Sequence, residues 1–181
     1  MNIIAGLLLA LLLSSPAHAH QGAEQPAAQH IETAFSPEAG SEALVLKVIR
    51  SAKETIRLAA YSFTSPVVVR GLLDAKRRGV DVRIVVDERG NKSKASKAAL
   101  NLVVNAGIPA RTISRYAIHH DKYIIADGST VQTGSFNYSK AAAKSNSENV
   151  VVVWNNPDLA ASFLRHWQDR YGQGAAYRSE Y

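Results

Sequence analysis

The sequence of 181 residues contains no cysteine. Disulfide bonds, thiolate nucleophiles and the common cysteine-based zinc sites are therefore excluded, so packing must stabilise the fold. No cluster of carboxylates resembles the ligand set of a two-metal site, and we expect the protein to need no metal and no cofactor. The chain also lacks an internal repeat and a boundary between domains, which indicates one folded unit.

Long apolar runs are scarce too. The run at residues 3–13 is too short to cross a bilayer, and it is followed by an A-x-A pattern at residues 17–19. This order is typical of an export signal, although the usual basic start is absent and an uncleaved anchor is the alternative. We predict a signal peptide at residues 1–19 and a flexible leader at 20–30. The mature protein would then be periplasmic or secreted by a bacterium, with no stable membrane insertion.

Acidic residues are outnumbered by basic ones, with 15 Asp and Glu against 21 Lys and Arg, a formal net charge of +6 and a pI near 9.7. A basic exported protein attracts polyanions, which include nucleic acids and anionic membrane surfaces. The sequence has no amphipathic helix with a basic face for binding a membrane. We therefore favour nucleic acid as the partner, DNA first and RNA as an alternative.

Helical and strand patterns alternate along residues 31–175, the predicted folded domain. The predicted strands are 31–35, 58–63, 80–86, 109–113, 120–126, 131–135 and 150–154, and the predicted helices are 41–56, 67–78, 98–106 and 157–171. This order predicts an α/β fold, with a mixed, largely parallel β-sheet flanked by helices on both faces. Residues 176–181 are predicted to form a C-terminal tail.

One segment concentrates groups that handle phosphate. It reads H-x-K, four residues, an aspartate, six residues and G-S-x-N, with its fixed positions at His120, Lys122, Asp127, Gly134, Ser135 and Asn137. Six residue types at fixed spacing form a far more specific signal than an isolated H-x-K.

The expected geometry of this segment brings four side chains to one end of the sheet. If a strand begins at His120, its imidazole and the Lys122 ammonium project from the same face. An Asp-Gly turn signal then predicts a hairpin that returns Ser135 and Asn137. The lysine would neutralise phosphate oxygens, while the hydroxyl and amide would donate hydrogen bonds to charge developing in the transition state.

This signature resembles that of the phospholipase D superfamily, and over residues 30–175 the chain resembles its short, single-motif bacterial endonuclease branch. The resemblance implies that His120 attacks phosphorus to form a phosphohistidine. It also implies a second histidine that protonates the leaving alcohol and then activates water. Because the chain carries one such motif, a homodimer that brings two copies of His120 together is the economical solution.

Two further roles follow from the resemblance. Glu148 matches an acidic residue that hydrogen-bonds the nucleophilic histidine, and an ordinary polar residue at a strand start is the alternative. Asp127 is taken as a site residue on the resemblance alone. Its turn position predicts that it supports the site through backbone or motif groups and does not touch the phosphate.

A basic loop follows the predicted strand 80–86, and further basic residues precede the motif. The candidates for binding a phosphodiester backbone are Arg89, Lys92, Lys94 and Arg115. In α/β sheets ligands collect at loops that leave the carboxyl ends of strands. A solvated loop is the alternative interpretation.

Three functions remain open at this point. The first is a metal-independent phosphodiesterase that hydrolyses DNA, and RNA as an alternative, with little sequence specificity, because phosphate contacts carry no sequence information. The second is a phospholipase D that acts on phospholipids by the same chemistry. The third is a non-catalytic nucleic-acid-binding module of a DNA-transfer apparatus.

Overall fold

The computed structural model describes residues 28–37 and 40–179. The predicted signal peptide and most of the predicted leader lie outside the described residues. The strands are β1 (His30–Ser36), β2 (Thr55–Ala60), β3 (Asp81–Asp87), β4 (Ala110–Ile113), β5 (Lys122–Ala126), β6 (Thr130–Gly134), β7 (Glu148–Trp154) and β8 (Ala175–Ala176). The helices are α1 (Ser41–Ser51), α2 (Pro66–Arg77), α3 (Lys94–Asn105), α4 (Lys140–Lys144) and α5 (Pro157–Gln173), with a 3-10 turn η1 at Arg89–Asn91.

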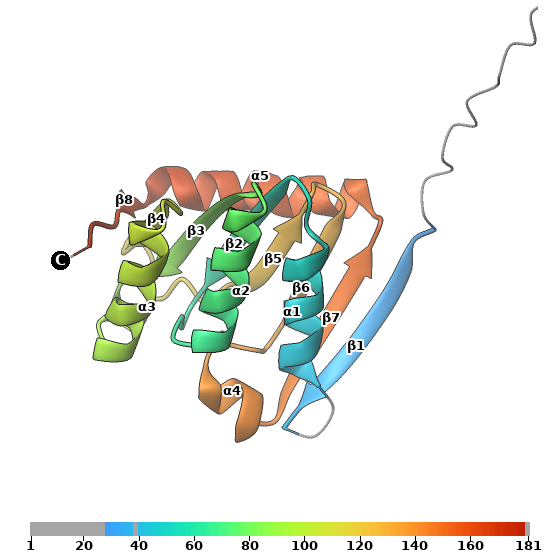
Figure 1. Ribbon diagram of the computed structural model, residues 1–181, viewed down its shortest axis with the longest axis horizontal. Coiled ribbons are helices and arrows are strands. Elements are labelled where there is room, and N and C mark those ends of the chain that lie inside the picture. Colours follow the sequence, from blue (N-terminus) through green and yellow to red (C-terminus); the bar gives the residue numbers. More distant parts are fainter. Residues whose placement is uncertain (1–27, 38–39, 180–181) are drawn as a thin grey trace, which may run out of the picture.

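The described strands form one sheet in the order β1-β7-β6-β5-β2-β3-β4-β8. Helices α1, α2 and α3 lie side by side along one face, and α5 crosses the strands (Figure 1). Alternate residues of β3 divide between two apolar cores: Val82 and Ile84 pack in the larger core with α1 to α3, and Val85 packs in the smaller core with α5. The predicted α/β fold with helices on both faces is confirmed.

The prediction of a largely parallel sheet is wrong. Among the described strands, only the pairs β2–β3 and β3–β4 are parallel, and these are the strands joined through α2 and α3. The pairs β1–β7, β2–β5, β4–β8, β5–β6 and β6–β7 are all antiparallel. Hairpin links join antiparallel strands, whereas a parallel pair needs a long crossover such as a helix. In the second half of the domain a tight turn joins β5 to β6, the chain returns through α4 from β6 to β7, and β1 pairs with β7.

Local signals place most element boundaries close to the predicted ones. Helix α3 begins earlier than predicted because the Ser93 hydroxyl accepts a hydrogen bond from the Ser96 N–H and caps the helix. The short α4 and β8 were not predicted from the sequence, since each has too few residues for a periodic pattern. Part of the predicted C-terminal tail is therefore paired with β4.

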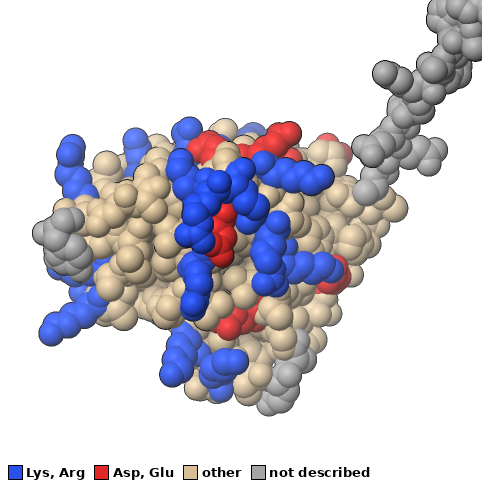
Figure 2. Space-filling model, viewed as in Figure 1, with Lys and Arg blue, Asp and Glu red and all other residues tan. Residues whose placement is uncertain are grey.

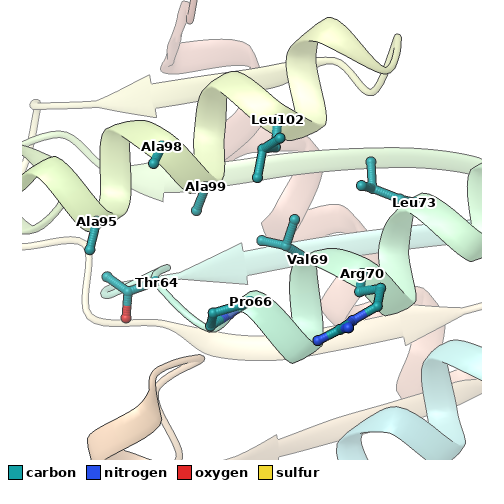
Figure 3. A pocket seen from close by; sticks show the side chains of 9 residues that line it. All are labelled: Thr64, Pro66, Val69, Arg70, Leu73, Ala95, Ala98, Ala99 and Leu102. Carbon is teal, nitrogen blue, oxygen red and sulfur yellow. The ribbon is translucent and has the colours of Figure 1, made fainter.

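The helical face has a basic and an apolar part. Lysine and arginine side chains gather on this face in Figure 2, and the exposed ones on α1 and α2 include Lys47, Arg50, Arg70 and Arg77. Beside them, a groove of about 380 Å³ runs between α2 and α3, where Leu102 is 56% exposed (Figure 3). No helix in the described ranges is long and apolar enough to cross a membrane.

We expect Gly134→Ala to destabilise the fold. A Cβ at this position would lie 2.3 Å from the carbonyl oxygen of Asn149, and the backbone φ of +146° disfavours any side chain. The expected loss is about 3 kcal/mol of unfolding free energy, measured by urea denaturation. The matched control is Gly172→Ala in α5, where a Cβ meets nothing within 4 Å. The control should be neutral or slightly stabilising, and equal losses for both variants would contradict the steric argument.

Candidate active site

All motif residues except Asp127 meet at one end of the strands, here called the site edge of the sheet. In the register, Ala60 at the end of β2 pairs with Lys122 at the start of β5, and Gly134 at the end of β6 pairs with Val150 near the start of β7. The chain reversals therefore bring the carboxyl ends of β2, β3 and β6 to the same edge as the amino ends of β5 and β7. This is where ligands bind in open α/β sheets.

His120 and Lys122 are held together by Tyr61, which follows β2. The Tyr61 ring makes an edge contact with the His120 ring at a centroid distance of 4.7 Å, and the Lys122 ammonium lies 5.3 Å from the centre of the Tyr61 ring. His120 precedes β5 and is exposed, whereas Lys122 opens the strand and is buried. The predicted strand thus starts too early, and the pairing of imidazole and ammonium comes from the aromatic contact.

The Lys122 side chain occupies a mostly dry position, with the residue only 7% exposed. Its Nζ donates a hydrogen bond to the His120 carbonyl oxygen at 2.9 Å. Burial lowers the pKa of Lys122 below its ordinary value, while the charges of Glu148 and Asp121 oppose that shift. The ammonium therefore lies against the backbone of His120 and is poorly compensated by water, which suits it to neutralise an anion.

Ser135 and Glu148 form a hydrogen-bonded pair across β6 and β7. The Ser135 hydroxyl donates to Glu148 Oε2 at 2.5 Å and accepts from the Asn149 N–H at 3.0 Å. The other Glu148 oxygen accepts from the Asn146 amide at 2.9 Å. The resemblance implied a bond between Glu148 and the nucleophilic histidine. Within this chain the carboxylate binds Ser135 and Asn146, so it acts on the site through the serine and through its charge near Lys122.

Asn137 lies beyond the end of β6 between two fully buried aromatic residues, Phe136 and Tyr138. Its side-chain oxygen is buried and has no hydrogen-bond partner among the described residues. Buried polar atoms are usually paired, and the Asn137 oxygen shares this exception with several other atoms of the described residues, among them His119 Nε2 and Trp154 Nε1.

Asp127 is the one motif residue that the structure separates from the others. It ends β5 at the opposite edge of the sheet, where its carboxylate accepts hydrogen bonds from the backbone N–H groups of Lys53, Glu54 and Thr55 at 2.8–2.9 Å. These bonds fix the turn between α1 and β2. The expectation that Asp127 binds backbone groups agrees with this geometry, but its assignment as a site residue does not.

The sequence interpretation missed a buried carboxylate that holds the His120 loop. Asp87, at the carboxyl end of β3, is only 1% exposed. Its Oδ2 accepts from the His119 N–H at 2.8 Å and its Oδ1 accepts from the Gly90 N–H at 2.6 Å. An aspartate at the end of an apolar strand is the signal that could have identified it.

Asn91 completes this support. Its amide donates to the carbonyl oxygens of Tyr61 and Asp87, both at 2.7 Å, and its side-chain oxygen accepts from the Phe63 N–H at 2.9 Å. The residue is buried, and its side-chain hydrogen bonds all go to backbone groups. It therefore ties the segment that carries Tyr61 to the one that carries Asp87.

The four predicted substrate-binding residues are all exposed around this edge. Arg89 donates to the Ala117 carbonyl oxygen at 3.1 Å, and Lys92 lies 3.8 Å from Glu88. Lys94 opens α3, and Arg115 follows β4. They surround the motif on two neighbouring loops but contact none of its residues in the bonds that the structure shows.

A cavity of about 460 Å³ opens beside His120 and Lys122 and reaches α5. The described residues contain no group of three or more His, Cys, Asp or Glu side chains that could hold a metal ion. An exposed imidazole beside a buried ammonium, with a hydroxyl–carboxylate pair on the same edge, is suited to nucleophilic attack on a phosphate group.

Comparison with known proteins agrees with this chemistry. Residues 45–170 match the family model described as cardiolipin synthase, PLD-like domain. The chain is 35% identical over 160 residues to a phospholipase D from Rickettsia felis, which covers 88% of this chain and 78% of that protein. It is 29% identical over 143 residues to a mitochondrial cardiolipin hydrolase from Xenopus tropicalis, which covers 77% of this chain and 64% of the relative.

Solved structures show the same fold. The phospholipase D family member Nuc from Salmonella typhimurium is 56% identical, with a TM-score of 0.83, and the match covers 84% of this chain and 100% of that one. NucT from Helicobacter pylori is 20% identical, with a TM-score of 0.70 and coverage of 83% and 100%. At that identity the second likeness concerns the fold alone.

Two aspartates that accept only backbone hydrogen bonds allow a test of what positions His120. Asp87→Asn and Asp127→Asn should each lower the free energy of unfolding by about 2 kcal/mol, because an amide nitrogen then faces a backbone N–H. Only Asp87→Asn should shift the NMR signals of the His120 imidazole, since only Asp87 binds the loop that carries it. Equal shifts in both variants, or none in Asp87→Asn, would contradict this assignment.

Proposed function

The chain belongs to the phospholipase D superfamily of phosphodiesterases, and from this premise we propose that it is an exported, metal-independent endonuclease that hydrolyses DNA with little sequence specificity. The observation that carries the proposal is the placement of His120 and Lys122 against Tyr61 at an open edge of the sheet. The net charge of +6 and the exposed basic residues on the neighbouring loops favour a polyanionic backbone as substrate. The A-x-A pattern at residues 17–19 supports export to the periplasm or beyond.

The proposed reaction has two displacements. In the first, a ring nitrogen of His120 forms a bond to phosphorus, the bond from phosphorus to the leaving oxygen breaks, and a second histidine gives that oxygen a proton. In the second, this histidine takes a proton from water, the water oxygen bonds to phosphorus, and the bond to His120 breaks. Lys122 offsets the charge on the phosphate oxygens in both steps.

The second histidine is proposed to be His120 of a partner subunit. His119, the sequence neighbour, is only 3% exposed, and burial lowers its pKa despite the nearby charges of Asp121 and Asp87. It is therefore poorly placed to deliver a proton to a bound substrate. A homodimer with its two-fold axis at the exposed His120 would supply an identical imidazole from the other side.

The phospholipase function remains a second candidate because the relatives from Rickettsia felis and Xenopus tropicalis carry the names phospholipase D and cardiolipin hydrolase. The chemistry at phosphorus would be the same, and only the groups on the diester would differ.

Degradation of plasmid DNA in excess EDTA tests the proposed activity. We expect the mature protein to cleave the DNA and His120→Ala to be inactive, because the nucleophile is lost. His30→Ala is the matched control, since His30 is an exposed histidine that pairs with Trp154 at the other end of the sheet. Cleavage only with added Mg²⁺ would contradict the mechanism. Head-group release from phospholipid vesicles with DNA left intact would favour the phospholipase, and DNA binding that survives His120→Ala without any turnover would favour a binding module.

The shared active site is tested by mixing subunits. Wild-type and His120→Ala chains are unfolded together, refolded at different ratios and assayed. If both copies of His120 are needed, activity follows the square of the wild-type fraction, so an equal mixture retains about a quarter of full activity. A linear dependence, with about half retained, would show that one chain holds both catalytic groups. His166, which lines the same cavity as His120, would then be the candidate for the second catalytic histidine.

A further inference from the structure

The cavity beside His120 has a second wall that the motif does not use. His120 and Lys122 line one side, and residues of α5, among them Phe163 and His166, line the other. Its volume of about 460 Å³ is in the range of small-ligand sites. A group attached to a phosphorus atom at His120 would therefore extend towards α5.

Asp121 holds the imidazole on this wall. Its Oδ2 lies 2.8 Å from His166 Nε2 and 3.4 Å from His119 Nδ1. The carboxylate thus orients the His166 ring, whose side chain remains 40% exposed.

An aromatic ring lies beside this histidine. Phe163 packs edge-on against Tyr123, with ring centroids 5.1 Å apart and an interplanar angle of 83°, and Tyr123 also faces His166 at 6.2 Å. Tyr123 is 3% exposed, so it forms a rigid support, while Phe163 is only partly buried. Flat rings held in this way bind nucleobases by stacking, and they do so with little regard to sequence because every base has a π-face.

We propose that the cavity between His120 and α5 is a nucleoside subsite, in which Phe163 and His166 contact the base and sugar next to the scissile phosphate. This inference rests on the proposed phosphodiesterase reaction and names the class of diester that the same site prefers. A nucleotide offers a ring for stacking and polar edges for His166 and Asp121, whereas the glycerol of a phospholipid offers no ring. The subsite therefore selects nucleic acid over lipid.

Inhibition by small phosphates tests the subsite without a polymer. Hydrolysis of methyl 4-nitrophenyl phosphate is measured in the presence of thymidine 3′-monophosphate, thymidine 5′-monophosphate or methyl phosphate. For the wild type, we expect at least one nucleotide to inhibit about tenfold more strongly than methyl phosphate, on the scale of one base stacked on an aromatic ring. Equal inhibition by all three compounds would overturn the proposal.

Two variants separate recognition from packing. Phe163→Leu keeps an apolar side chain against Tyr123 but removes the aromatic face, and His166→Gln keeps a donor for Asp121 but removes the ring. In each, the preference for the nucleotide should fall to about threefold or less. Gln168→Ala, an exposed change on α5 outside the cavity lining, should keep the full preference. Persistence of the preference in both cavity variants would also overturn the proposal.

Calorimetric titration of the intact protein with the same three compounds measures their binding and does not require hydrolysis. If hydrolysis is absent but the nucleotide binds more tightly than methyl phosphate, the proposed function fails and the subsite stands. If hydrolysis depends on His120 but the three compounds bind equally, the subsite fails and the proposed function stands.

Discussion

The register of β5 between β2 and β6 is the constraint on which the site depends. All five residues of β5 are buried, and its alternate side chains pack into the two different cores. A slip of one residue would exchange the sets that face each core and would expel Lys122 from its position beside Tyr61. Apolar packing on both faces of β5 therefore fixes the position of the Lys122 ammonium, and polar contacts adjust that position only locally.

The site concentrates features that cost stability elsewhere in proteins. A lysine is held away from water, an aspartate is buried at 1% exposure, and the Asn137 oxygen lacks a partner among the described residues. Charged groups lose solvation when they are buried, and each is tolerated only with compensation. Asp87 receives two backbone N–H groups as compensation, and the Lys122 ammonium donates a hydrogen bond to the His120 carbonyl oxygen. Local violations of the usual rules are typical of functional sites.

Much of the site could be predicted from residue spacing because the motif is local in sequence. A strand, a turn and a returning strand bring Lys122 and Ser135 to one edge, and the sequence contains all three signals. The place of Asp87 at the end of an apolar strand marks it in the sequence, but its bond to the His120 loop and the bonds of Asn91 to the Tyr61 and Asp87 segments depend on tertiary packing. Asp127 is near the other motif residues in sequence, but the length of β5 carries it to the opposite end of the strands, where its turn position had predicted bonds to backbone groups. The antiparallel pair β5–β6 was predicted from its turn signal, but the other antiparallel pairings escaped the sequence analysis because periodicity identifies a strand without identifying its neighbour.

The pairing of β1 with β7 has a consequence for how the chain folds. These strands come from the two ends of the domain, and His30 faces Trp154 across the ladder. β1, the first of the described strands, is therefore among the last to find its partner, and closure of the loop between residues 36 and 148 must precede that contact. Until residues 148–154 are present, β1 has no template on which to form. The complete sheet thus requires nearly the whole domain, because the strand that pairs with β1 begins only at Glu148.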